Sequence, residues 1–212
     1  MSIRLYSYWR SSAAYRVRIA LNLKSLPYEI ETVSLVPGVS EHRADAYRAM
    51  NPQMLVPFLQ DGDLGIAQSM AILEYLEETY PETPLLPDVE PARSRVRAFC
   101  NLIACDIHPL NNLRVQLYLS NELDASKQAA RDWYVHWVHE GFGSLEALSG
   151  DGPYVMGDSV TLADVLLVPQ MYNARRFEVP VDRFPRLVNI VDNCNELPAF
   201  KKAAPDMQAD AS

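Results

Sequence analysis

The sequence has few cysteines and no long apolar run. Only three of its 212 residues are cysteine (Cys100, Cys105 and Cys194), and no two of them form a C-x-x-C pair. An odd number of cysteines without metal-ligand spacing is typical of buried thiols in a reducing compartment. No stretch is long and apolar enough to cross a bilayer, and no signal peptide can be recognised, so we expect a cytoplasmic protein with no membrane partner.

Basic residues are also in deficit. Lysine and arginine together number 19 against 27 aspartates and glutamates, which gives a formal net charge of −8. This balance argues against a nucleic-acid partner. A metal-ligand motif is lacking as well. His136 and His139 lie three residues apart, but no third ligand or H-E-x-x-H pattern accompanies them, so we expect packing or surface roles and no metal.

Residues 1–80 alternate between strand and helix patterns. Apolar and polar residues alternate from Ile3 to Tyr8, as in a half-buried strand. Asp61-Gly62-Asp63 separates two short apolar runs and predicts a hairpin turn. Pro57 falls inside one of these runs, where its missing N–H donor favours an edge, a bulge or a cis bend. The expected strands are residues 3–8, 28–35, 55–59 and 64–67, and the expected helices begin at Ser11-Ser12 and cover 41–50 and 69–79.

The second part of the chain reads as helical. Four prolines within residues 80–91 predict a linker. Apolar residues then recur at three- and four-residue spacing over residues 92–120, 126–148, 161–175 and 184–196. Thr161 and Asp164 form a capping-box pattern at the start of the third of these helices. The small, polar tail after Ala203 is expected to fray.

The pair Ser11-Ser12 is the strongest functional feature in the residues themselves. A short strand runs into the two serines and a helix opens at once, which aims hydroxyls and unpaired backbone N–H groups at one point. Such a point binds and stabilises an anion. The alternative from the residues alone is a plain N-cap serine, whose role is structural.

The order of elements, the linker and the helical second part resemble the glutathione transferases. Residues 11–21 are similar to the zeta-class signature S-S-C-x-W-R-V-R-I-A-L, and Gln68-Ser69 is similar to the family's glutamyl-recognition pair. Residues 106–115 and 173–177 also resemble zeta-class segments. The resemblance implies an α/β thioredoxin-like N-terminal domain (1–80), a linker (81–91) and an all-α C-terminal domain (92–212). Ala13 replaces the signature's cysteine, so any thiol must come from glutathione.

The resemblance also implies roles for individual residues. Ser11 would stabilise the glutathione thiolate, with Ser12 second, and two arginines would bind the carboxylates of a dicarboxylate substrate. Purely structural roles are the alternatives. The serines could be helix caps, the arginines could form surface ion pairs, and Val56 could precede a simple edge-strand proline. The histidines could be isolated residues with a structural or surface role. The expected catalytic residues are Ser11, Arg10 and Arg176, and the expected glutathione-binding residues are Ser11, Ser12, His42, Val56, Gln68, Ser69, His108 and Asn112.

The function implied is glutathione-dependent cis–trans isomerisation of a maleyl keto-acid, with maleylpyruvate favoured over maleylacetoacetate. Glutathione would act as a cofactor, because it returns unchanged. The same site could instead conjugate glutathione or remove halide from α-halo acids. A third interpretation is a non-catalytic binding module, favoured by the loss of the cysteine at position 13. The resemblance further implies a homodimer.

Overall fold

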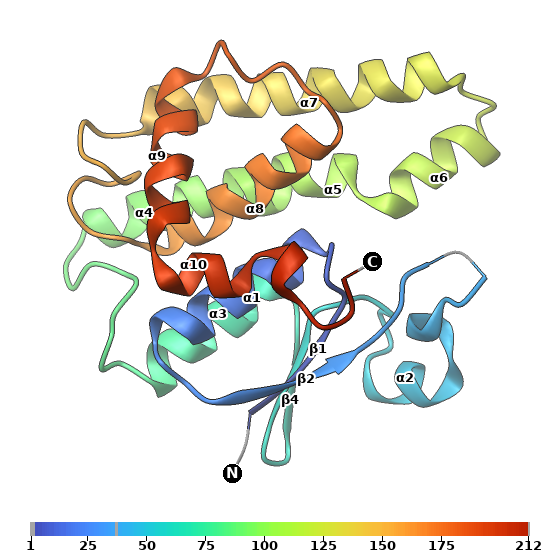
Figure 1. The fold of residues 1–212 in the computed structure, drawn as a ribbon, viewed down its shortest axis with the longest axis horizontal. Coiled ribbons are helices and arrows are strands. Elements are labelled where there is room, and N and C mark those ends of the chain that lie inside the picture. The colour runs from blue at the N-terminus through green and yellow to red at the C-terminus, as the bar shows by residue number, and fades with distance from the viewer. Residues whose placement is uncertain (1–2, 37, 212) are drawn as a thin grey trace. The chain divides into compact units, whose positions relative to one another are not determined.

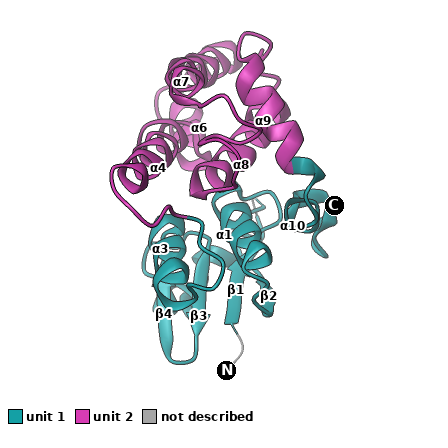
Figure 2. Cartoon of the chain, turned by 90° about the vertical axis from the view of Figure 1, so that its left-hand side faces the viewer, with its two compact units in different colours: residues 1–85, 195–212 teal, residues 86–194 magenta. Residues whose placement is uncertain are grey.

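The computed structural model describes residues 3–36 and 38–211, and its chain divides into two compact units. Residues 1–85 and 195–212 form the first unit, and residues 86–194 form the second (Figure 2). Residues 195–212 therefore group with the first unit, whereas the sequence predicts a helical domain over all of 92–212. The predicted domain boundaries themselves stay a prediction.

The first unit is built on a four-stranded mixed sheet with the order β2-β1-β3-β4. Its strands are β1 (Ile3–Ser7), β2 (Tyr28–Thr32), β3 (Phe58–Asp61) and β4 (Leu64–Ala67). β1 runs parallel to β2 and antiparallel to β3, and β3 and β4 form the predicted hairpin. The third strand begins later than predicted, at Phe58, because Pro57 has no N–H to donate.

Helices cover the sheet of the first unit. They are α1 (Ser12–Leu23), α2 (Asp45–Met50), α3 (Ser69–Thr79) and α10 (Pro198–Ala203). α1 packs against both α3 and α10 (Figure 1). β1 alternates as predicted: Ile3 and Leu5 are buried on one face, while Tyr6 on the other face contacts the rings of Tyr47 and Phe58 edge-on.

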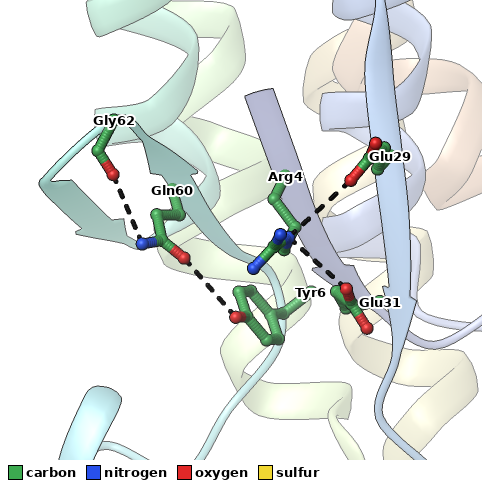
Figure 3. Close-up of polar contacts among 6 residues, drawn as sticks. All are labelled: Arg4, Tyr6, Glu29, Glu31, Gln60 and Gly62. Atoms are coloured by element: carbon green, nitrogen blue, oxygen red, sulfur yellow. Dashed lines mark hydrogen bonds and ion pairs between the residues drawn. The ribbon is translucent and has the colours of Figure 1, made fainter. Parts of the chain in front are cut away.

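Polar side chains link the strands on the Tyr6 face of the sheet. Nε of Arg4 on β1 lies 3.4 Å from a carboxylate oxygen of Glu31 and 3.9 Å from one of Glu29, both on β2 (Figure 3). The Tyr6 hydroxyl donates to Gln60 of β3 over 3.5 Å (Figure 3). Because Arg4 and its two partners are well exposed, these ion pairs contribute little to stability.

A buried ion pair joins α1 to α3. The Nζ atom of Lys24 lies 2.7 Å from Oε1 of Glu77, and only 1% and 8% of the two side chains is exposed. The same ammonium donates to the backbone carbonyls of Tyr80 and Thr83, both at 2.9 Å. Glu77 in turn accepts from the backbone N–H of Leu85. This network anchors the segment that follows α3.

The second unit is helical. Its helices are α4 (Ala92–Asn101), α5 (His108–Asn111), α6 (Leu113–Asn121), α7 (Lys127–Leu148), α8 (Leu162–Arg176) and α9 (Pro185–Glu196), the last of which runs into the first unit. None of the helices among the described residues is both long and apolar enough to cross a membrane.

The prediction of one helix over residues 92–120 is wrong. A π-helical stretch, Leu102–Ile107, follows α4, and the extended backbone of Asn112 separates α5 from α6. Pro109 contributes to the interruption because it cannot donate a helical hydrogen bond. Ile107 in the π-helical stretch packs directly against Gly141 of α7, where a Cβ atom would collide with its side chain.

The predicted capping box at Thr161 and Asp164 is confirmed. The Thr161 hydroxyl accepts from the backbone of Ala163, and the Asp164 carboxylate accepts from the backbone N–H of Thr161 at 2.8 Å. Asp164 also accepts from the N–H of Val155 at 2.8 Å. Burial raises the pKa of the Asp164 carboxyl, and these hydrogen bonds oppose that shift.

The expectation that the tail frays after Ala203 is wrong. Pro205–Met207 forms a 3₁₀ turn in which Pro205 is buried. Further along, the carboxylate of Asp210 accepts a hydrogen bond of 3.0 Å from the backbone N–H of Trp9. Local composition did not reveal this order, because the partner of Asp210 lies 201 residues earlier in the chain.

Candidate functional site

Ser11 ends a tight turn and begins α1. Its backbone N–H donates to the carbonyl of Tyr8 at 2.9 Å, which closes the turn around Trp9 and Arg10. Its Oγ atom accepts from the N–H of Ala14 at 3.2 Å, so Ser11 is an N-cap. A hydroxyl that accepts this bond still has a proton to donate. The cap and the predicted anion-stabilising role are therefore compatible, and Ser12, buried at the first position of α1, stands beside it.

Arg16 of α1, to which the sequence assigned no site role, contacts a predicted glutathione-binding residue. Its Nη1 atom donates to the Oγ atom of Ser69 at 3.1 Å. Both residues are buried, and Ser69 is the first residue of α3. One clue was available: an arginine in the apolar run from Tyr15 to Leu21 must find buried acceptors.

Gln68 precedes α3 in an uncommon backbone conformation. Its φ is +73°, in a region that residues with a Cβ atom seldom adopt. Residues held in uncommon backbone conformations cluster at functional sites. Its Nε2 atom donates to Oε1 of Gln53 at 2.8 Å, and its carbonyl accepts from Ile72 in the first turn of α3. The exposed Gln68 and the buried Ser69 thus form adjoining parts of the α3 N-terminus.

Val56 and His42 lie in the loops around the sheet. The Val56 side chain packs in a cluster with Val33, Tyr47 and Phe58, and its backbone lies outside the ladder of β3, which starts two residues later. The cis bond at Val56–Pro57 is one of the alternatives that the sequence suggested for Pro57. His42, half-buried in a 3₁₀ turn, has its Nδ1 atom 3.3 Å from the carbonyl oxygen of Ser34.

The two predicted substrate arginines share one arrangement. Arg10 lies over the ring of Trp9, with the guanidinium carbon 4.0 Å from the ring centroid, and Arg176 lies over Phe177 at 4.2 Å. Both arginine side chains are exposed. Stacking uses the face of a guanidinium, whereas its N–H donors lie in the plane. The in-plane N–H donors are the groups that would bind a carboxylate through paired hydrogen bonds.

Arg176 lies beside a cavity in the second unit. The cavity has a volume of about 250 Å³ and is lined by Gln116, Ser120, Lys127, Ala130, Arg131, Tyr134, Val135 and Phe177. Burial raises the pKa of the Tyr134 phenol, and the positive charge of Arg176 acts in the opposite direction. The rings of Tyr134 and Phe177 are 4.3 Å apart between centroids. An aromatic wall therefore continues from the cavity to the guanidinium of Arg176.

The remaining predicted residues of the second unit lie at helix starts. His108 is the first residue of α5. Asn112 caps α6, since its Oδ1 atom accepts from the N–H of Val115 at 3.3 Å. As for the paired histidines of α7, the Nε2 atom of His139 lies 2.8 Å from the carbonyl oxygen of Pro180, and the ring of His136 packs on Trp137.

Three features together define a class of protein: the sheet with its covering helices, the capped serine turn and the helical second unit. The family model of the glutathione S-transferase N-terminal domain matches residues 5–84, and that of the C-terminal domain matches residues 110–203. The chain belongs to the glutathione S-transferase family. The predicted fold, a thioredoxin-like domain followed by a helical part, is confirmed.

Individual relatives are more specific. The chain is 48% identical to the probable maleylacetoacetate isomerase of Vibrio cholerae, over 100% of this chain and 99% of that protein. It is 46% identical, with a TM-score of 0.95 over 99% of this chain and 100% of the other, to a solved structure of maleylpyruvate isomerase described as a bacterial zeta-class glutathione-S-transferase. A maleylacetoacetate isomerase from Anaeromyxobacter dehalogenans, solved with glutathione in its active site, is 40% identical with a TM-score of 0.89 over 100% and 98%.

Proposed function

We propose that this protein is a glutathione-dependent cis–trans isomerase that converts a maleyl keto-acid into its fumaryl isomer. The observation that carries the proposal is the Ser11 hydroxyl, which caps α1 while it keeps a proton to donate. Relatives that are named for this reaction, or solved with glutathione bound, support it over the full length of the chain.

The residues of the first unit suit glutathione, a tripeptide with one thiol and two carboxylates. The N-termini of α1 and α3 each present backbone N–H groups and a positive dipole end, which favour anions. Ser11 and Ser12 would face the thiolate, and Gln68 and Ser69 the γ-glutamyl carboxylate. The backbone of Val56, outside the ladder of β3, would bind the cysteinyl part through its N–H and carbonyl groups.

Arg16 prepares Ser69 for this task. Because the guanidinium donates to Oγ of Ser69, that oxygen is held in place and its own proton is directed to another acceptor. A carboxylate bound there would receive a charge-assisted hydrogen bond. The buried positive charge of Arg16 adds electrostatic stabilisation in a medium of low dielectric constant. We also place His42, His108 and Asn112 among the groups that contact glutathione.

Bound glutathione would supply the thiolate nucleophile for the cis double bond of the substrate and would be released unchanged. The protein's own part is to orient and to stabilise charge. Ser11 and the N–H groups of α1 lower the free energy of the thiolate form. Arg10 and Arg176 would hold the two carboxylates of the keto-acid by paired hydrogen bonds. Ala13 excludes a protein thiol from this position.

Arg176 offers a direct test of the substrate assignment. Replacing it with glutamine (Arg176→Gln) is expected to raise the KM for the keto-acid about 10- to 100-fold and to leave the KM for glutathione unchanged, because a charge-assisted pair of hydrogen bonds to substrate is lost. Steady-state kinetics with each reactant varied in turn measure both values.

The matched control is the neighbouring residue. Arg175→Gln removes the same charge from the end of α8, but the Arg175 side chain pairs with Asp192 at 3.2 Å on the surface. It should leave both KM values close to those of the wild type. Equal effects of the two substitutions would remove Arg176 from the substrate site.

The reaction itself is tested by following the ultraviolet absorbance of maleylpyruvate, maleylacetoacetate and an α-halo acid with and without glutathione. The proposal expects rapid loss of either maleyl absorbance only when glutathione is present, with maleylpyruvate the better substrate. Halide release without isomerisation would identify a dehalogenating transferase. Failure to turn over any of the three, or to bind immobilised glutathione, would contradict the proposal.

The proposal includes a homodimer in the cytoplasm. α6 exposes Leu113 and Leu117, whose spacing of four residues places them on one helix face, and Tyr118 follows Leu117 in the chain and is exposed as well. Such a face is suited to contact with a second copy of the chain. The three cysteines are free, which suits a reducing compartment. Light scattering with size-exclusion chromatography measures the mass in solution.

A further inference from the structure

We propose that Asp210, near the C-terminus, is a positioning residue for the turn that carries Ser11. The inference rests on the proposed function, because it concerns the same thiolate-stabilising hydroxyl. It assigns part of that function to a segment that contributes none of the predicted site residues. The juxtaposition behind it is a carboxylate from the end of the chain against the backbone of Trp9.

The peptide groups of Trp9 are held on both sides. Its N–H donates to Oδ2 of Asp210 at 3.0 Å, and its carbonyl accepts from Nη2 of Arg18 at 3.0 Å. Trp9 is one of the two central residues of the turn that Ser11 closes by its bond to Tyr8. Trp9 is buried, with 5% of the residue's surface exposed. The path of the chain into Ser11 is thus determined by two partners outside the turn.

Arg18 connects the same turn to the C-terminal segment. Its Nε atom donates to the carbonyl of Ala203 at 2.9 Å, while its Nη1 atom donates to Oγ of Ser7 at 3.1 Å. This arginine is fully buried, and α10, which ends at Ala203, packs on α1. Both partners of the Trp9 backbone are therefore connected to the C-terminal segment: Asp210 belongs to it, and Arg18 donates a hydrogen bond to it.

The segment around Asp210 is itself ordered by contacts. Pro205 is buried, and the side-chain amide of Gln208 donates to the carbonyls of Ala204 at 2.8 Å and Lys202 at 3.1 Å. Asp210 is thus the end of a folded connection rather than of a loose tail. Its carboxylate therefore loses little conformational entropy when it accepts the hydrogen bond from Trp9.

The consequence for catalysis follows from geometry. Loss of the Asp210 side chain removes the acceptor that holds the peptide N–H of Trp9, and this loosens the turn. The hydroxyl of Ser11 must point at the sulfur to stabilise its charge, and small misplacements of a catalytic group cost large factors in rate. Asp210 acts through Ser11 and does not touch the reactants.

The test compares three variants of the full-length protein. Asp210→Ala removes the acceptor, and Asp210→Asn removes the charge but keeps a carbonyl oxygen that can accept. Asp206→Ala is the matched control, since Asp206 is an exposed aspartate of the same segment. Three quantities are measured: hydrogen exchange of the Trp9 amide, the pKa of the thiol of bound glutathione from thiolate absorbance, and kcat and KM for the keto-acid.

For Asp210→Ala we expect about tenfold faster exchange at Trp9, a raised thiol pKa and a kcat lowered about 5- to 20-fold, with the KM for the keto-acid little changed. Asp210→Asn should recover most of all three effects, and Asp206→Ala should match the wild type. Asp210→Ala kinetics and thiol pKa equal to those of Asp206→Ala would overturn the inference. An equal loss in Asp210→Asn would also overturn it, because the charge and not the positioning contact would then be responsible.

The thiol measurement separates this inference from the proposed function. It needs bound glutathione but no keto-acid. A wild type that shows no isomerisation, with a thiol pKa that still rises in Asp210→Ala, would refute the reaction and support the positioning role.

Discussion

Replacing Ser11 with alanine should lower the kcat for glutathione-dependent isomerisation about 100- to 1,000-fold. A positioned donor that stabilises developing or resident negative charge in an active site is worth about this factor. The protein should still fold, because the lost helix cap costs only about 1 kcal/mol. Steady-state kinetics and chemical denaturation measure the two effects on the same preparation.

Ser126 provides the matched control for this substitution. It caps α7, and its Oγ atom accepts from the N–H of Ala129 at 3.1 Å, just as Ser11 does from Ala14. Ser126→Ala should therefore cost a similar free energy of unfolding and leave kcat unchanged. If Ser11→Ala and Ser126→Ala were alike in both measurements, Ser11 would be a structural cap and nothing more.

The largest effect on stability is expected for Lys24→Met. The substitution leaves the carboxylate of Glu77 buried without its counter-charge and removes the donor to the carbonyls of Tyr80 and Thr83. Breaking one partner out of a buried pair costs about 3–5 kcal/mol. The free energy of unfolding from urea titration should fall by that amount.

The control for Lys24→Met is a surface ion pair with a similar distance between nitrogen and oxygen. Lys201 lies 2.8 Å from Glu196, but 57% of its side chain is exposed. Lys201→Met should therefore cost less than about 1 kcal/mol. A loss for Lys24→Met that is no larger than this would show that the buried pair does not anchor the segment after α3.

Local patterns were sufficient where a structure depends on neighbours in sequence. The alternation in β1 identified its buried face, Asp61-Gly62-Asp63 located the hairpin, and Thr161 with Asp164 formed the predicted cap. The N-cap role of Ser11 was likewise readable, because capping involves residues three positions apart. These features need no knowledge of the rest of the fold.

Patterns failed where distant parts of the chain decide the outcome. Apolar spacing alone could not show that Ile107 needs close contact with Gly141, or that the chain bends at Asn112. The polar tail gave no sign that Asp210 would find Trp9. Arg16 was given no site role, because its acceptor, Ser69, lies 53 residues away. The roles of the individual site residues came from family resemblance and stay predictions.

The central claim is that the N-terminus of α1, with Ser11, holds the thiol of bound glutathione deprotonated at neutral pH. A titration of thiolate absorbance in the complex of wild-type protein with glutathione, without any substrate, tests it most directly. The account predicts a thiol pKa below 7, against about 8.5 for a free thiol. A bound thiol that titrates at the same pH as free glutathione would contradict it.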